Sequence, residues 1–248
     1  MIRWIAAFLL LAAPAVHAAD ITVLSAGAIN SIAKTLIPAF EAKTGNKVTL
    51  RNDTVGGLVR RITGGETFDV VMMSPAGLDQ LAKAGKIAPK SDVRLAAVGI
   101  GVGVKSGAPA PDISTVAAFK AAMLRSRKVA YINPASGGSS GIYLAKLFQT
   151  LGIADAMTPK SVLIDGGLAA TAVLDGRADI VVQQISEVVA VPGITLVGPL
   201  PAKIQNQTIY AGAVAAGTSA PAASRAFLAA MASPAAQPVL KTKGMLPP

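Results

Sequence analysis

Residues 54–86 read TVGGLVRRITGGETFDVVMMSPAGLDQLAKAGK, and this stretch decides the fold because it predicts two helix starts that follow strands. Thr54, with glycines close behind it, is typical of a helix N-cap, and Ser74 followed by Pro75 is typical of another. The beginning of a helix carries free backbone N–H groups and the positive end of the helix dipole, which together bind anions. The stretch therefore predicts an α/β protein that binds a small anion.

The same alternation of strand and helix continues on both sides of this stretch. Upstream, the runs 21–24 and 47–51 are strand-like, and Ile32, Leu36 and Phe40 repeat at helical spacing between them. Downstream, strand and helix patterns alternate from residue 116 to residue 197. This alternation favours an α/β fold built on parallel sheets.

Two long apolar strands, 95–104 and 208–215, indicate how the chain is divided. They lie far apart in the sequence, and we interpret them as two crossings between two lobes. On this interpretation residues 1–18 are a signal peptide, residues 19–101 together with 208–248 form the first lobe, and residues 102–207 form the second lobe. Glycines within both strands would absorb a hinge motion.

The N-terminal segment MIRWIAAFLLLAAPAVHA has a basic start, a short apolar centre and a small-residue end. Because this pattern is typical of a secretory signal, we expect a periplasmic protein. Its removal would take away the only histidine, His17, and the chain contains no cysteine. Metal sites built on these residues, disulfides, and catalysis by Ser-His-Asp or Cys-His groups are then excluded for the mature chain. We expect no metal, no cofactor and a monomer.

The formal net charge of +10 is spread as single residues and short pairs along the 248-residue chain. This distribution favours a small anionic ligand. It does not favour nucleic acid, because the chain has no stripe of lysine and arginine interleaved with aromatic residues.

Ligands of open parallel sheets bind at the C-terminal edges of the strands. Four segments expected at such edges are rich in hydroxyls, amides and small residues: 25–31, 52–57, 133–141 and 183–187. The candidate ligand-binding residues are Ser25, Asn30, Thr54, Gly56, Gly57, Ser74, Ser139, Ser140, Gly141, Tyr143 and Gln183.

Two further side chains each have two interpretations. Glu187 either complements the dipole of a helix in its first turn or faces the cleft, where a carboxylate repels an anion unless it is protonated or paired. The hydroxyl of Tyr143 either points into the cleft or belongs to a side chain that covers the core.

Three segments, ITVLSAGAINSIAKTLIPAFEAKTGNKVTL, TVGGLVRRITGGETFDVVMMS and SSGIYLAKLF, resemble the periplasmic molybdate-binding proteins of ABC transporters in their order and spacing. The resemblance implies a type II periplasmic binding protein fold, in which hydroxyls and backbone amides hold an anion between two α/β lobes. It also implies a membrane permease as partner. Ala28 and Val55 stand where the family pattern has serines, and the amides and glutamate of 183–187 suit a small polycarboxylate.

The chain also resembles aconitate isomerase, which looks like a divergent member of the same group. That resemblance implies proton abstraction beside a carboxylate, and without histidine the base would be Glu187, Asp165, a lysine or Tyr143. We therefore predict a periplasmic receptor that captures a small anion for ABC import. The alternatives are an aconitate-isomerase-like enzyme using the same cleft, and a sensor or adhesion module without transport.

Overall fold

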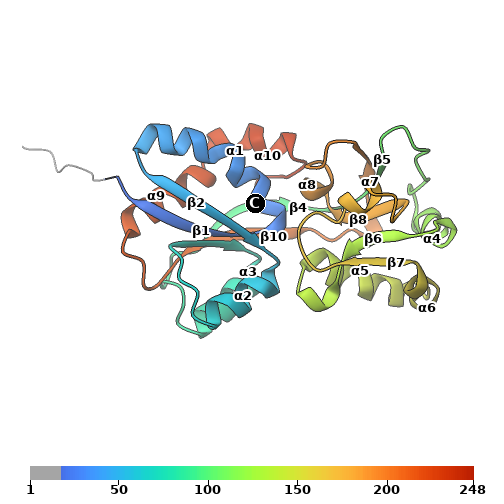
Figure 1. The fold of residues 1–248 in the computed structure, drawn as a ribbon, viewed down its shortest axis with the longest axis horizontal. Coiled ribbons are helices and arrows are strands. Elements are labelled where there is room, and N and C mark those ends of the chain that lie inside the picture. The colour runs from blue at the N-terminus through green and yellow to red at the C-terminus, as the bar shows by residue number, and fades with distance from the viewer. Residues whose placement is uncertain (1–17) are drawn as a thin grey trace, which may run out of the picture.

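The computed structural model describes residues 18–248, and its elements form two α/β lobes side by side along the long axis of the molecule (Figure 1). The predicted signal peptide lies outside the described residues except for Ala18. Each lobe is built on a five-stranded sheet, with the strand order β2-β1-β3-β10-β4 in the first lobe and β7-β6-β8-β5-β9 in the second. Within the described residues no helix has both the length and the apolar character needed to cross a membrane.

In the first lobe, β1 pairs in parallel with β2 and β3, while β10 runs antiparallel to β3 and β4. Helices α1, α9 and α10 cover one face of the sheet, and α2 and α3 cover the other (Figure 1). The strands are β1 (Asp20–Ala26), β2 (Lys47–Asp53), β3 (Val70–Met73), β4 (Val93–Val98) and β10 (Thr208–Val214). The helices are α1 (Gly27–Thr44), α2 (Val55–Thr63), α3 (Pro75–Lys83), α9 (Pro221–Met231) and α10 (Gln237–Thr242), with a 3₁₀ turn at Pro234–Ala236.

In the second lobe, β6 pairs in parallel with β7 and β8, while β5 runs antiparallel to β8 and β9. The strands are β5 (Ile100–Lys105), β6 (Val129–Ile132), β7 (Ser161–Ile164), β8 (Ile180–Gln184) and β9 (Ile194–Pro199). The helices are α4 (Val116–Arg125), α5 (Ser139–Thr150), α6 (Ala154–Met157), α7 (Thr171–Leu174) and α8 (Ile185–Val188), with 3₁₀ turns at Pro134–Ser136, Thr158–Lys160 and Ala202–Ile204.

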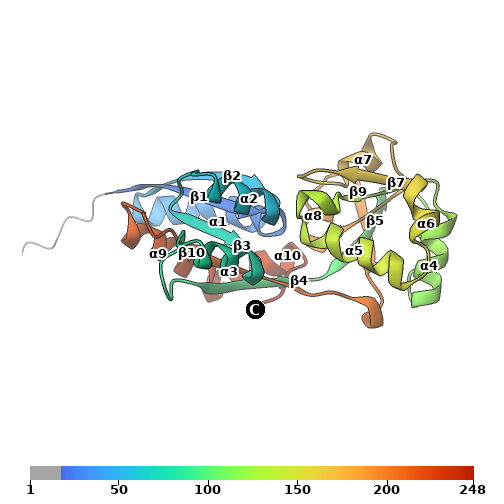
Figure 2. The ribbon, with the colours of Figure 1, turned by 90° about the horizontal axis from the view of Figure 1, so that it is seen from below.

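The chain crosses between the lobes twice, once between β4 and β5 and once between β9 and β10 (Figure 2). The prediction of one unbroken strand over 95–104 is wrong, because the strand breaks at Gly99, where β4 leaves the first sheet and β5 enters the second. Gln205, in the second crossing between β9 and β10, stabilises the chain at this break. Its side chain accepts a hydrogen bond from Ile100 N at 2.9 Å and donates one to Ile100 O at 2.9 Å.

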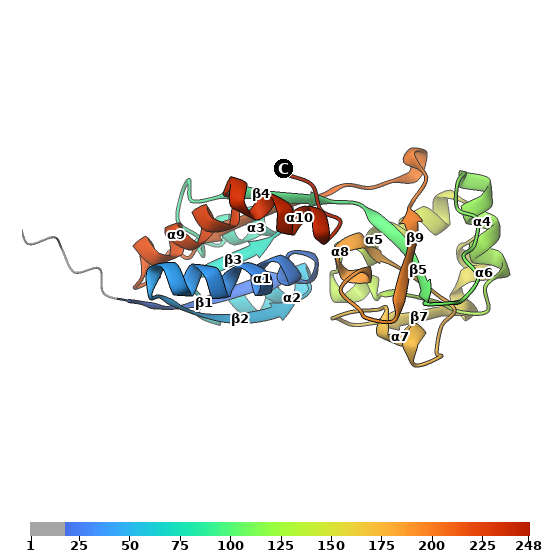
Figure 3. The same cartoon turned by 90° about the horizontal axis from the view of Figure 1, so that it is seen from above.

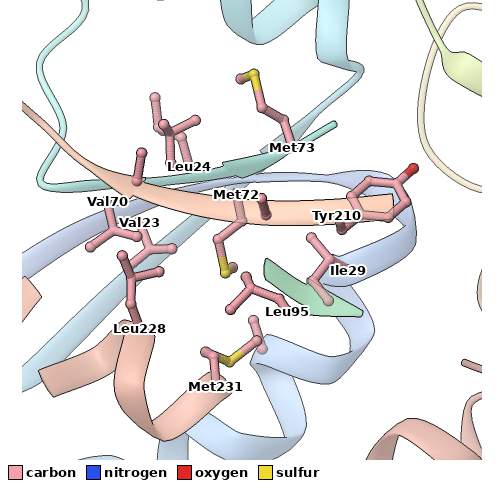
Figure 4. Packing of buried hydrophobic residues seen from close by; sticks show 14 of the residues in the cluster. Val23, Leu24, Ile29, Val70, Met72, Met73, Leu95, Tyr210, Leu228 and Met231 are labelled. Atoms are coloured by element: carbon pink, nitrogen blue, oxygen red, sulfur yellow. The ribbon is translucent and has the colours of Figure 1, made fainter. Parts of the chain in front are cut away.

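The largest hydrophobic core lies in the first lobe, on both faces of its sheet. Val23, Met72 and Leu95 point from the strands toward Leu228 of α9, whereas Leu24 points to the opposite face (Figure 4). All five are at most 1% exposed. Burial of a side chain of this size contributes about 1.5–3 kcal/mol, so this core fixes the strand ends that face the other lobe.

Two smaller hydrophobic clusters, one on each face of the second sheet, form the core of the second lobe. Phe119, Leu144 and Phe148 pack α4 and α5 on one face, and Val173 and Val188 pack α7 and α8 on the other. The predicted helix 168–174 is shorter than expected, because only Thr171–Leu174 is helical.

Candidate functional site

A small cavity of about 30 Å³ lies between the lobes, at the ends of strands from both sheets. It has room for about two water molecules. The first lobe contributes residues at the ends of β1 and β2, together with Tyr210 of β10. The second lobe contributes residues at or after the ends of β6, β7 and β8. The lining residues are Ala26, Gly27, Ala28, Asn52, Asp53, Thr54, Val55, Ile132, Gly138, Ser139, Ser140, Gly167, Glu187 and Tyr210.

Three long helices begin at this cavity. Gly27 is the first residue of α1, Val55 of α2 and Ser139 of α5, and all three line it. The first backbone N–H groups of a helix have no partner within the helix, although in α2 Gly56 N and Gly57 N bond to Gly137 O and Thr54 Oγ1. The dipoles of the three helices place positive potential on the same space. The cavity therefore favours negative charge without any cation in its wall.

The lobes are joined by hydrogen bonds around the cavity. Thr54 Oγ1 accepts from Gly57 N at 3.0 Å, which caps α2, and donates to Ser136 O of the second lobe at 2.6 Å. Ser186 Oγ of the second lobe donates to Ala28 O at 2.9 Å. The lobes are thus closed on each other, and a ligand larger than the cavity must either extend into an adjoining space or separate them.

Glu187 is the buried carboxyl of the site, only 7% exposed, in the first turn of α8. Its carboxyl lies against Gly27, so closely that any Cβ at that position would collide with Oε1. Burial raises the pKa of Glu187 to about 8, because the ionised form loses its hydration. Glu187 is therefore mostly protonated at neutral pH and readily exchanges a proton slightly above it.

Tyr210 stands beside Glu187 on the first-lobe wall. It is 2% exposed, and its hydroxyl lies 3.4 Å from Ser139 Oγ across the lobe boundary. Burial raises the pKa of Tyr210, and the charge of Glu187 raises it further. Figure 4 shows the hydroxyl at the end of the ring that points away from the labelled core. A neutral phenol here can donate a hydrogen bond into the cavity.

The other carboxylate in the lining, Asp53, is compensated. Arg61 Nη1 lies 3.1 Å from Asp53 Oδ2, and Arg61 also binds Glu66. Hydrogen bonds to these carboxylates raise the pKa of Arg61, which stays charged. Neither Arg60 nor Arg61 lines the cavity, so within residues 18–248 no arginine takes part in its wall.

A larger cleft of about 450 Å³ continues from the cavity toward solvent and shares Gly27, Asn52, Gly167 and Glu187 with it. We call it the outer cleft. Its other lining residues are Asn30, Ser31, Lys34, Thr35, Leu168, Ser186, Ala190 and Lys243.

The structure brings part of the predicted set together. Thr54, Ser139, Ser140 and Glu187 line the cavity, and Asn30 lines the outer cleft. Each of the four predicted edge segments contributes at least one lining residue to one of the two spaces.

Other predicted residues have structural partners and line neither space. Ser25 Oγ donates to Ala26 O, Tyr143 donates its hydroxyl to Ile204 O at 2.8 Å, and Gln183 binds Ala169 N and Gly167 O.

The remaining predicted positions also lie outside the cavity wall. Ser74 begins α3 with Pro75, as predicted, but it lines neither the cavity nor the outer cleft. Gly56 contacts Gly137, Gly57 lies behind Asp53, and Gly141 packs against Ile132 O. Asp165 accepts a hydrogen bond from Asn133 Nδ2 at 2.8 Å. In the described part of the chain, no cluster of acidic, histidine or cysteine residues could hold a metal.

Sequence reasoning missed Tyr210, Lys34 and Lys243. Tyr210 lies in the predicted crossing strand, so its place at the lobe boundary followed from the pattern, but the face of the strand it occupies did not. Lys34 follows Asn30 by four residues in a predicted helix, which places both on one face. Lys243 carried no sequence signal, because its position depends on where the chain end folds back.

Comparison with known proteins agrees with this geometry. Residues 21–246 match the family described as bacterial extracellular solute-binding protein. An aconitate isomerase from a Pseudomonas species is 35% identical over 233 residues, covering 92% of this chain and 87% of that protein.

Solved structures share the fold. The periplasmic molybdate-binding protein of Azotobacter vinelandii has a TM-score of 0.79 at 20% identity, covering 92% of this chain and 99% of that one. A sulfate-binding protein of Mycobacterium tuberculosis has a TM-score of 0.74 at 20% identity, covering 93% of this chain and 87% of that one. The predicted type II periplasmic binding protein fold is confirmed, and the chain belongs to the bacterial extracellular solute-binding protein family.

Proposed function

We propose that this protein is an isomerase that interconverts cis- and trans-aconitate, or a closely related unsaturated polycarboxylate, in the cleft between its lobes. The observation that carries the proposal is Glu187, a protonatable carboxyl buried in the wall of the cavity between the lobes. The identity with an aconitate isomerase over nearly the whole chain supports it.

The proposed reaction is a shift of one proton between two carbons of the substrate. Ionised Glu187 removes a proton from the methylene carbon beside a carboxylate, and the electrons of that C–H bond form the new double bond. The electrons of the old double bond take up a proton at its far carbon, delivered by the same carboxyl. Atoms and charge balance, and no oxidant or second substrate is needed.

The surroundings of Glu187 suit this chemistry. A general base works best when its pKa lies near the operating pH, and burial brings Glu187 to about 8. Negative charge that develops on the substrate carboxylate would meet the N-termini of α1, α2 and α5, and the neutral hydroxyl of Tyr210 can donate to it. Asp53 adds little opposing charge because Arg61 compensates it.

A receptor for ABC import is the second candidate, and the three converging helix starts favour it, because they suit any small anion. In that case the protein would act in the periplasm and deliver its ligand to a membrane permease. A buried carboxyl with no basic residue in the wall of the cavity is hard to explain for a receptor alone, since it weakens anion binding whenever it ionises.

The test is turnover by the purified protein. We expect trans-aconitate to be converted to the cis isomer, followed by proton NMR, with kcat/KM rising with pH until about 8. Glu187→Gln should lower kcat by about 10²–10⁴-fold. Asp155→Asn is the matched control, because Asp155 is exposed on α6 and remote from the cavity, and it should keep full activity.

Thermal shifts separate the two candidates. Anions that bind the folded state raise the melting temperature by mass action. If molybdate, sulfate or citrate stabilises the protein and no aconitate turns over at any pH, the isomerase proposal is wrong and the receptor remains. An unchanged rate in Glu187→Gln would remove Glu187 as the base.

A further inference from the structure

The outer cleft has the size and the chemistry of a second binding space joined to the cavity. Its volume of about 450 Å³ lies within the range of roughly 300–1,000 Å³ that is typical of small-molecule sites. The cavity beyond Glu187 is much smaller. A ligand that reaches Glu187 and is longer than a single oxyanion must therefore extend into the outer cleft.

The charges of the outer cleft are unbalanced. Lys34 and Lys243 line it, and within the described chain neither of them forms an ion pair. The carboxyl in its wall is Glu187, which burial keeps mostly protonated at neutral pH. The lining of the outer cleft therefore carries a net positive charge.

Two polar atoms of the same wall are buried without a hydrogen-bond partner, Asn30 Oδ1 and Ser31 Oγ. Buried polar atoms are nearly always satisfied, and leaving one unpaired costs about 1–3 kcal/mol. The Ser31 hydroxyl can donate to a carboxylate, and Asn30 can do so through Nδ2, whereas the unpaired Asn30 Oδ1 accepts from a protonated carboxyl or a hydroxyl of a ligand. These atoms are a second, independent sign that the outer cleft is built for a polar ligand.

Helix α1 arranges one wall of the outer cleft. Gly27, Asn30, Ser31 and Lys34 follow one another at helical spacing, so they form a stripe on one face of α1 that runs outward from Glu187. The stripe begins at the free N–H groups of the helix and ends at an ammonium group. A carboxylate beside Lys34 would thus lie beyond the position that Glu187 can reach.

The end of α10 supplies the other lysine. Lys243 is the C-cap of α10, and Gly244 follows it with φ of +65°. A Cβ at Gly244 would collide with Ile185 of α8, the helix that carries Glu187. Figure 3 shows this end of α10 beside the start of α1, on the side of the first lobe that faces α8. Glycine at this position therefore lets Lys243 approach the lobe boundary.

We propose that Lys34 and Lys243, with Asn30 and Ser31, form a subsite for a carboxylate remote from the reacting carbon, so that the cleft selects polycarboxylates over single oxyanions. The proposal rests on the proposed function for the role of Glu187, because it names the substrate class of that same site. It concerns binding, and can be tested without turnover.

The experiment measures dissociation constants by calorimetry for tricarballylate, a saturated tricarboxylate that cannot isomerise, and for sulfate. The variants are Lys34→Gln, Lys243→Gln and the double variant. We expect each single substitution to weaken tricarballylate binding about tenfold, and the double substitution to weaken it further, with sulfate affinity changed less than twofold. Lys34→Arg should restore most of the affinity.

Lys241→Gln is the matched control, because Lys241 is exposed on the same helix, outside the lining of the cleft. The proposal is overturned if the control weakens tricarballylate as much as Lys243→Gln does, if sulfate and tricarballylate weaken equally, or if tricarballylate does not bind. A protein that binds tricarballylate through both lysines but does not isomerise aconitate would contradict the proposed function and leave the subsite intact.

Discussion

Glu187 and Gly27 show how one residue pair links packing to chemistry. Gly27 begins α1 in ordinary helical conformation, so an alanine would suit the backbone there, but the carboxyl of Glu187 would have to move to make room for it. The missing side chain makes the space in which Glu187 is desolvated. Desolvation then raises the pKa of Glu187 into the range useful for proton transfer.

The raised pKa of Glu187 makes stability depend on pH. The carboxyl titrates near 4.5 in the unfolded chain and near 8 in the folded protein. Between these values the folded state holds a proton that the unfolded state has lost, so the free energy of unfolding falls as pH rises and levels off above pH 8. The total loss is on the order of a few kcal/mol.

Urea unfolding at a series of pH values tests this. Glu187→Gln should remove that part of the slope, so that the variant gains stability over the native protein as pH rises, while Asp155→Asn follows the native curve. Parallel curves for the native protein and Glu187→Gln would mean that Glu187 titrates normally.

At the scale of elements, the residue that begins α2 both caps the helix and contacts the second lobe. Thr54 caps the helix through Gly57 N and also bonds Ser136 O in the second lobe. Thr115 caps α4 through Ala118 N at 3.1 Å and makes no contact across the lobe boundary. The two threonines therefore separate the effect of a cap from the effect of a lobe contact.

We expect Thr115→Ala to cost about 1 kcal/mol of stability in urea unfolding, with anion affinity unchanged. Thr54→Ala should cost a similar amount and also weaken anion binding severalfold, because the closed form loses a hydrogen bond. Equal affinities in the two variants would show that the Thr54 contact does not stabilise the liganded state.

The same elements show what sequence patterns can predict. The helix starts at Thr54 and Ser74 were recognisable from local residue patterns, although only Thr54 caps its helix through a side-chain hydrogen bond. Only one of the two faces the cavity, because that depends on strand order, which no local pattern specifies. The break at Gly99 depends on Gln205, more than a hundred residues away. Glu187 could be identified from the sequence as a candidate site residue because it follows a predicted strand. Its burial against Gly27 could not be predicted, because Gly27 belongs to the other lobe.

At the scale of the whole molecule, closure brings together residues that belong to different lobes. Gly56 of α2 and Gly137 of the second lobe touch through their backbones, with Gly56 N donating to Gly137 O at 3.2 Å. A Cβ at Gly56 would lie 2.8 Å from Gly137 Cα, which is too close for the lobes to stay as they are.

Gly56→Ala should therefore act on closure alone. Alanine favours a helix, so the folding of α2 is not impaired, but the lobes are held apart. We expect a larger radius of gyration in X-ray scattering with ligand present, and weaker anion binding. Gly217→Ala is the control, because a Cβ there meets no other atom, and it should leave both quantities unchanged. Native-like compaction in Gly56→Ala would show that the boundary yields easily.

The fold of the chain end has a practical consequence for how this protein is handled. Leu246 pairs with Ala97 of β4 through two backbone hydrogen bonds, 2.9 Å and 2.8 Å long, and Gly244 rests on α8. A purification tag fused after Pro248 would follow this pairing directly, only a few residues along the chain from Lys243 of the outer cleft. A tag that disturbs the pairing would also shift Lys243, so binding assays should use protein from which the tag has been cleaved.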